Sequence, residues 1–166
     1  MTDDLTTLAA VLGREHWRIE TVTVRLHVLR MAIRGDWPGS LDDADAGLAD
    51  AVDRLRQDEL ARAVVASGVA GRLGLDAEPT LSQLLDGAPD ALARPLLVTA
   101  DGLAHAIEAA RSTAADVTLE LHDAAYNRST SKRGAAVTPT RAAVLGRLLE
   151  RIIPPSIEHF LGLRVG

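Results

Sequence analysis

Apolar residues recur at alternating intervals of three and four along the first part of the chain. The positions that carry this pattern are Leu5, Leu8, Leu12, Glu15, Ile19, Val22, Leu26, Leu29 and Ile33. Such spacing keeps one stripe on one face of a helix, and only Glu15 interrupts its apolar character. Residues Thr21 to Val28 also alternate between apolar and polar, which taken alone is typical of a strand. Because the three-four spacing continues on both sides of that window, we predict one long helix.

A second long helix is predicted from about Asp42 to Leu73. Pro38 and the glycines beside it cannot continue the first helix, so a turn is expected between the two. The positions expected on the inner face of the second helix are Leu48, Val52, Leu55, Ala66, Val69 and Leu73. Gly74 follows the last of them and supplies a left-handed cap that ends the helix.

Two more helices are predicted before residue 127. Thr80 and Gln83 have the spacing of a capping box, which predicts a short helix that Gly87 and Pro89 close. A long helix then runs from about Asp90 to Tyr126. Its three-four seam is expected to comprise Leu96, Ala100, Leu103, Ile107, Ala110, Ala114, Val117, Leu121 and Ala124.

The periodic pattern stops after Tyr126. Residues 127–140 contain serine, glycine, proline and a few basic side chains, a composition that predicts a flexible linker. Residues 141–166 form an amphipathic C-terminal segment, interrupted by Pro154 and Pro155 and followed by a second apolar piece from Ile157 to Leu163. The apolar positions of its first helix are Val144, Leu145, Leu148, Leu149, Ile152 and Ile153.

A helix as short as this C-terminal one is not stable alone in water, so it must dock. It is either a last helix of the core or a segment that covers a groove and yields to a partner. A third reading, a helix on a membrane surface, is weakened because Arg147, Glu150 and Arg151 supply too little net positive charge to attract anionic lipid.

Together these elements predict an all-α fold, an elongated antiparallel helical bundle with long amphipathic helices and a short C-terminal helix. The predicted organisation is a bundle domain at residues 1–126, a linker at 127–140 and the C-terminal segment at 141–166. Composition agrees with this fold class. Hydrophobic residues make up 47% of the chain but aromatic residues only 2%, which favours helices that meet through small side chains.

Charge and composition narrow the classes of function. The chain has no cysteine, which excludes disulfides and thiolate chemistry. Asp3 and Asp4 stand where a signal peptide would need basic residues, and no apolar run reaches membrane-spanning length. A net charge of -5 disfavours binding to nucleic acid. We therefore expect a cytoplasmic protein with no nucleic-acid partner and no membrane insertion.

No arrangement typical of catalysis or metal binding is evident in the sequence. No two histidines share the close helical spacing that metal ligands on one helix prefer. The histidines are His16, His27, His105, His122 and His159. Glu15 and Glu59 could form an acid/base pair, but such carboxylates more often pair with arginine, and Arg62 and Arg18 are available. We expect no enzymatic activity, no cofactor and no metal.

The acidic cluster Asp42, Asp43 and Asp45 resembles a calcium loop only in composition. If Gly47 is aligned with the glycine that a calcium loop requires, alanines occupy two of the positions that should supply calcium ligands. An acidic helix N-terminus that complements the helix dipole explains the same residues.

From Leu5 to about Tyr126, about three-quarters of the chain, the order of these signals resembles the FlgN family of export chaperones. The resemblance is carried by Leu8, Leu12, Glu15, Arg56, Glu59, Leu60, Arg62, Ala63, Leu73, Gly74, Leu75, Thr80, Leu81, Leu84 and Pro89, leading into the long final helix. It implies a cytosolic chaperone that binds the terminal amphipathic helices of flagellar hook-associated proteins. Such a chaperone prevents their premature assembly before type III secretion.

The resemblance also implies the partners and the site. The partners would be hook-associated proteins, together with components of the export apparatus, and the chain would be a monomer or a homodimer. Client binding would lie in the C-terminal half, where the candidate residues are Val117, Leu121, Ala124, Tyr126, Leu145, Leu148, Leu149 and Ile152. The alternative function is a non-flagellar helical scaffold or coiled-coil adaptor that acts through dimer or partner-helix contacts.

Overall fold

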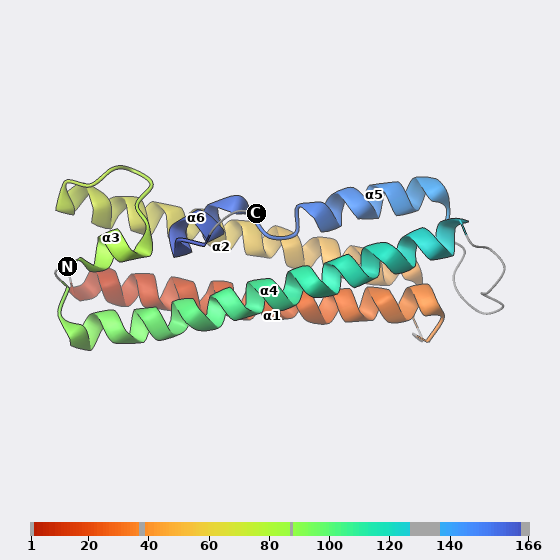
Figure 1. Ribbon diagram of the computed structural model, residues 1–166, viewed down its shortest axis with the longest axis horizontal. Helices are drawn as coiled ribbons and strands as arrows, with labels where there is room; N and C mark the ends of the chain where they lie inside the picture. Colours follow the sequence, from red (N-terminus) through yellow and green to blue (C-terminus); the bar gives the residue numbers. More distant parts are fainter. Residues whose placement is uncertain (1, 37–38, 87, 127–136, 164–166) are drawn as a thin grey trace. The chain divides into compact units, whose positions relative to one another are not determined.

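The computed structural model describes residues 2–36, 39–86, 88–126 and 137–163, and within these ranges every regular element is a helix (Figure 1). The elements are α1 (Thr2–Arg34), α2 (Leu41–Leu73), α3 (Leu81–Leu85), α4 (Asp90–Tyr126), α5 (Pro139–Glu150) and α6 (Pro155–Leu161). The predicted all-α bundle of long helices with a short C-terminal helix is therefore confirmed. The strand alternative for residues Thr21 to Val28 is wrong, because they lie within α1.

The helices form two compact units. Unit 1 comprises Met1–Ile19, Arg54–Ile107 and Pro154–Gly166, and it contains α3 and α6. Unit 2 comprises Glu20–Asp53 and Glu108–Ile153, and it contains α5. The three long helices α1, α2 and α4 each contribute one segment to both units.

The predicted seam of α1 is buried at all nine positions, including Glu15. On α2 the predicted inner face is buried except at its last position. Leu73 remains 37% exposed because α2 ends there and Gly74 turns the chain with a φ of 70°. On α4 the buried position after Leu121 is Ala125 rather than the predicted Ala124, so the seam ends with a step of four. Ala100 is only half-buried.

Side-chain pairs show how the long helices run. In unit 1, Asp4 pairs with Arg72 at 2.7 Å and Arg18 pairs with Asp58 at 2.9 Å. The pairs occur in reverse order along the two helices, so α2 is antiparallel to α1, as the sequence predicted. In unit 2, Arg30 contacts Asp116 and Arg34 contacts Glu120, so α4 is parallel to α1.

Helix ends follow the chemistry of their capping residues. The predicted capping box at Thr80 and Gln83 is present, with reciprocal hydrogen bonds to the backbone of α3. Ser40 and Asp43 make the same exchange before α2: the Asp43 N–H donates to Ser40 Oγ, and the Ser40 N–H donates to the Asp43 carboxylate. Gly162 ends α6 in the left-handed region with a φ of 72°.

The C-terminal segment divides between the two units. The predicted linker lies mostly outside the described residues, and α5 begins at Pro139 after the buried Val137. The apolar positions Leu145, Leu149, Ile152 and Ile153 are buried, whereas Val144 is 52% exposed. The second apolar piece forms α6, which contributes Ile157 and Phe160 to the core of unit 1.

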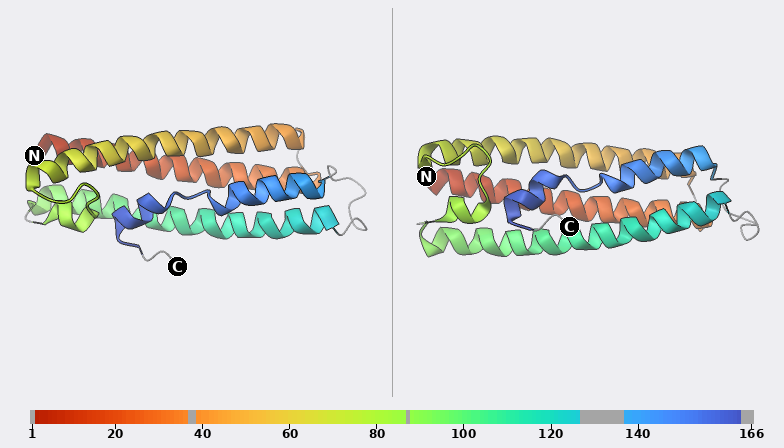
Figure 2. Two further views of the ribbon diagram at one scale, coloured as in Figure 1. Left: turned by 90° about the horizontal axis from the view of Figure 1, so that it is seen from above. Right: turned by 45° about the horizontal axis from the view of Figure 1, so that its top comes forward.

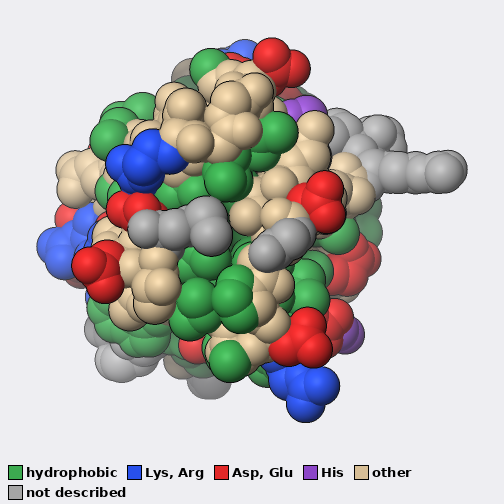
Figure 3. Space-filling view, turned by 90° about the vertical axis from the view of Figure 1, so that its left-hand side faces the viewer, with side chains coloured by type: hydrophobic (Ala, Val, Ile, Leu, Met, Phe, Trp, Pro, Cys, Tyr) green, Lys and Arg blue, Asp and Glu red, His purple; other side chains and the backbone are tan. Residues whose placement is uncertain are grey.

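Among the described helices, none is both long enough and apolar enough to span a bilayer. At the end of unit 1 where α1 begins, hydrophobic side chains reach the surface between acidic and basic ones (Figure 3). Isolated apolar side chains on a surface are ordinary for folded proteins.

Candidate functional site

The eight residues expected to contact a client all lie in unit 2, on or just after α4 and α5. Five of them are at most 4% exposed: Val117, Leu121, Leu145, Leu149 and Ile152. Ala124 and Leu148 are half-buried, and Tyr126 is 59% exposed. Most of these side chains are therefore buried within the protein and cannot contact another molecule unless the helices around them move.

The structure brings the α4 candidates and the α5 candidates together. Both views in Figure 2 show α5 running beside the end of α4. Two hollows lie between these helices. The first, of about 150 Å³, is bordered by Leu121, His122 and Tyr126 of α4 and by Ala142, Ala143 and Gly146 of α5. The second, of about 470 Å³, lies between Ala114, Thr118 and Leu119 of α4 and Leu149, Ile152 and Ile153 at the end of α5. We call this contact the α4/α5 seam.

Local sequence explains why α5 forms and docks. Thr138 is its N-cap and accepts a hydrogen bond from the Arg141 N–H, while Pro139 occupies the first turn. Leu145 and Leu149 are four residues apart and so share one face. Burying each of these leucines stabilises the docked helix by about 1.5–3 kcal/mol. A helix of 12 residues that is marginal alone becomes stable through this contact.

An ion-pair cluster fastens the start of α5 to the start of α2. The Arg141 guanidinium lies 2.7 Å from Asp42 Oδ1 and 3.4 Å from Asp45 Oδ2. Asp42 is 84% exposed, so solvent screens the first contact and its contribution is small. Asp43 has a different role: hydrogen bonds from the Ser40 side chain and backbone lower the pKa of its carboxyl. The acidic cluster thus serves helix capping and α5 docking.

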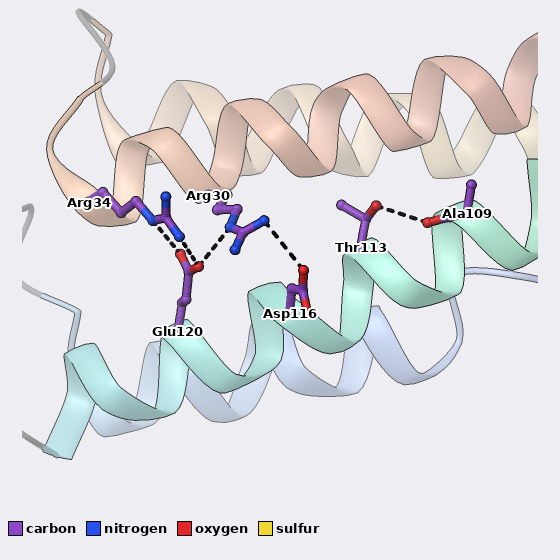
Figure 4. Close-up of polar contacts among 6 residues, drawn as sticks. All are labelled: Arg30, Arg34, Ala109, Thr113, Asp116 and Glu120. Atoms are coloured by element: carbon purple, nitrogen blue, oxygen red, sulfur yellow. Dashed lines mark hydrogen bonds and ion pairs between the residues drawn. The ribbon is translucent and has the colours of Figure 1, made fainter.

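A second charge cluster joins α4 to α1 (Figure 4). Glu120 accepts hydrogen bonds from Arg30 Nε at 2.7 Å and from Arg34 Nε at 2.9 Å. Partial burial tends to raise the pKa of Glu120, but the hydrogen bonds from Arg34 and Arg30 outweigh it, and the net shift is downward. Arg30 also reaches Asp116 at 3.4 Å. These contacts fix the α4 wall of the α4/α5 seam from its opposite side.

Unit 1 contains a buried polar cluster. Arg62 Nε donates to Glu15 Oε1 at 3.0 Å, and the Glu15 side chain has no exposed surface. Desolvation raises the pKa of Glu15 to about 7, although the charge and hydrogen bond of Arg62 oppose the shift. The second nitrogen of Arg62 donates to Ser156 Oγ at 3.3 Å, and its guanidinium carbon lies 4.7 Å from the Phe160 ring centroid.

These contacts decide how the two glutamates of the predicted acid/base pair are used. Glu15 is paired with Arg62, as the alternative reading predicted, and Glu59 accepts a hydrogen bond from Ser156. Arg18, the other available arginine, pairs with Asp58 instead. Within the described ranges, no cluster of three histidine, aspartate or glutamate side chains is arranged to hold a metal ion.

Comparison of the chain with protein-family models, with curated proteins and with solved structures gave no significant match.

Two of these polar contacts were not identified from the sequence. Arg141 falls in the predicted C-terminal segment, and nothing in its local spacing points to Asp42, which is distant in the chain. The contacts of Arg62 with α6 are similarly remote. A signal for the Glu15–Arg62 pair was present, because Arg62 occupies a seam position of α2, seven residues after Leu55 and four before Ala66.

Proposed function

We propose that this protein is a cytoplasmic chaperone that binds an amphipathic helix of its client. In its specific form, the client helices are the terminal helices of flagellar hook-associated proteins, held from assembly until type III secretion. The resemblance of residues 5–126 to the FlgN family supports the identity of the client. The observation that carries helix binding is the α4/α5 seam, where an amphipathic helix of this chain is seated on α4.

The chemistry of the seam suits exchange of one helix for another. α5 is short, Leu145 and Leu149 form its buried face, and the ion pair of Arg141 with Asp42 is solvent-screened. A client helix with apolar residues at the same spacing would contact the same α4 side chains, including Val117 and Leu121. Because α5 is part of the same chain, it competes at a high effective concentration. Its return to α4 would also favour client release at the export gate.

The test compares the client affinity of the wild-type chain, in which α5 is docked on α4, with that of a variant in which α5 is released. The variant Leu145→Asp/Leu149→Asp places charges in the buried face of α5 and should release it from α4. Val144→Asp is the matched control, since it makes the same change on the exposed face of that helix. Synthetic terminal helices of the hook-associated proteins from the source organism are titrated calorimetrically into each protein. We expect tighter binding to the double variant and unchanged binding to the control.

Two further outcomes decide the proposal. Val117→Asp with Leu121→Asp should abolish binding, and because both side chains are buried, the result counts only if circular dichroism and melting stay near those of the parent protein. If neither the wild-type chain nor the undocked variant binds any hook-associated helix, the flagellar proposal fails. Equal affinity of the wild-type chain and the undocked variant would instead remove the α4/α5 seam as the binding surface.

The second candidate is a non-flagellar scaffold or coiled-coil adaptor. It is favoured by the outer face of α2, where Leu60 is 68% exposed and Val64 is 74% exposed one turn later. Under this reading α5 remains docked and α2 supplies the contact. Sedimentation of the wild-type chain and of Leu60→Asp distinguishes the two, because only the adaptor reading predicts an oligomer that this substitution dissociates.

A further inference from the structure

Unit 1 contains a surface cavity of about 340 Å³, open to solvent on one side, that the helix-binding proposal does not use. It lies among α2, the loop before α3 and α6, which neighbour one another in Figures 1 and 2. Its walls are mainly apolar and include Ala63 and Ala66 of α2, Pro79 of the loop, and Pro155 and Phe160 of α6. Apolar cavities of this size with a few convergent polar groups are the usual form of small-molecule sites.

Its principal polar group is the Arg62 guanidinium. The Arg62 side chain is 4% exposed, and it borders the cavity together with Ser156 and His159. Its Nε donates to Glu15 Oε1, and its Nη2 donates to Ser156 Oγ. A guanidinium carries five N–H donors, so Arg62 retains capacity for an oxygen acceptor. Planar carboxylates fit this group best.

The counter-ion of Arg62 is incomplete. Glu15 is fully buried, and its Oε2 accepts no hydrogen bond from the described residues. Desolvation raises the pKa of Glu15 to about 7, so near neutral pH protonation of Glu15 weakens its ion pair with Arg62. An anion in the cavity would supply the missing charge.

We propose that this cavity binds a medium-chain carboxylate, with the tail against Ala63, Ala66 and Phe160 and the carboxylate on Arg62. The bound carboxylate takes the place of ionised Glu15 as counter-ion, and Glu15 takes up one proton. No bond to carbon forms or breaks. Affinity should therefore fall as pH rises, because at higher pH the ligand must compete with an ionised Glu15.

Other charged groups surround this pair. Those on the adjoining elements are Arg14 and Arg18 on α1, Asp58 and Glu59 on α2, Glu78 in the loop, and Glu158 and His159 on α6. One of these groups, His159, is a histidine, the side-chain type that most often changes charge near neutral pH. It contacts the Glu78 carbonyl through Nε2 at 3.4 Å and borders the cavity, so the test must separate it from Glu15.

The experiment titrates octanoate and 1-octanol into the full chain by calorimetry at pH 6 and pH 8. Octanoate is ionised at both values, and 1-octanol has the same tail without the charge. Ala63→Phe places a bulky ring at the exposed wall of the cavity and should obstruct it, and Ala10→Phe is the matched control on the exposed face of α1. Glu15→Gln removes the proposed proton acceptor, and His159→Gln removes the competing one.

We expect one saturable site for octanoate, weaker binding of 1-octanol, loss of binding in Ala63→Phe and retention in Ala10→Phe. Affinity should fall roughly tenfold between pH 6 and pH 8 in the wild-type chain and in His159→Gln, but stay constant in Glu15→Gln. The proposal is overturned by absent octanoate binding, by equal affinity for 1-octanol, or by binding that survives Ala63→Phe. A pH dependence that persists in Glu15→Gln, or disappears in His159→Gln, overturns the role of Glu15. None of these results depends on the α4/α5 seam.

Discussion

Replacing Glu15 by glutamine should remove the contribution of this buried carboxyl to the pH dependence of folding stability between pH 4.5 and pH 7. Glu15 is fully buried, and desolvation raises the pKa of its carboxyl from 4.5 to about 7 against the opposing effect of Arg62. The folded chain therefore binds this proton more tightly than the unfolded chain. The stabilisation from the proton is complete below pH 4.5 and is lost as pH rises through 7.

The magnitude follows from the two pKa values. The difference between 4.5 and about 7 corresponds to about 3 kcal/mol of unfolding free energy. Most protein carboxyls act in the opposite direction, since acid usually removes stabilising charges. Glu120 is an example in this chain: hydrogen bonds from Arg34 and Arg30 outweigh its desolvation and lower the pKa, so stabilisation from Glu120 is lost as pH falls. The contribution of Glu15 is therefore obtained by comparing variants.

Urea unfolding followed by far-ultraviolet circular dichroism measures the effect at intervals from pH 4.5 to pH 8. Wild type minus Glu15→Gln should give a free-energy difference that changes by about 3 kcal/mol over this range. Glu108→Gln, an exposed carboxyl on α4, is the matched control and should give a flat difference. A flat difference for Glu15→Gln as well would show that the buried carboxyl is ionised throughout, and the argument from desolvation would be refuted.

Three further perturbations test individual contacts. Leu145→Ala should destabilise unit 2 by about 2–5 kcal/mol, because it opens a cavity under α5, while Val144→Ala on the exposed face should change thermal unfolding little. Arg141→Gln should cost at most about 1 kcal/mol, decline with added salt and speed amide exchange in α5, whereas Arg147→Gln on the exposed face should not. Thr80→Ala should cost about 0.5–2 kcal/mol by removing the capping box of α3, visible as faster amide exchange there.

The long helices were predictable because their pattern is local. The three-four spacing from Leu5 to Ile33 requires only that one face of the helix be buried, and α1 extends three residues beyond that range at its start and one at its end. Two buried positions that were predicted wrongly lie near the ends of helices. Leu73 sits at a helix end, where no following turn covers it, and the seam of α4 shifts from Ala124 to Ala125 in its last turn.

The candidate site could be predicted only in part from the spacing of apolar residues. Amphipathic spacing identified Leu121 and Leu145 as apolar positions that must be covered, but spacing does not say what covers them. Those two positions lie on α4 and α5, which neighbour each other in unit 2. Whether a buried helix face belongs to the permanent core or to a replaceable contact depends on the affinity of a second molecule, which no single sequence contains.

A polar residue in an otherwise apolar seam indicates which position of the neighbouring helix lies opposite it, whereas an apolar residue does not. Glu15 is the polar position in the seam of α1, and Arg62 is a buried polar residue on the inner face of α2. A charge at a buried position is costly without an opposite charge, whereas leucines can pack against many neighbours. Pairing Glu15 with Arg62 therefore selects one antiparallel register of α1 against α2. In an antiparallel pair of helices, the residue numbers of opposite positions add up to a constant. The pair Asp4 and Arg72 gives nearly the same total as Glu15 and Arg62, so both pairs belong to one register. We infer that this buried pair favours one alignment of two helices whose apolar positions repeat at regular spacing.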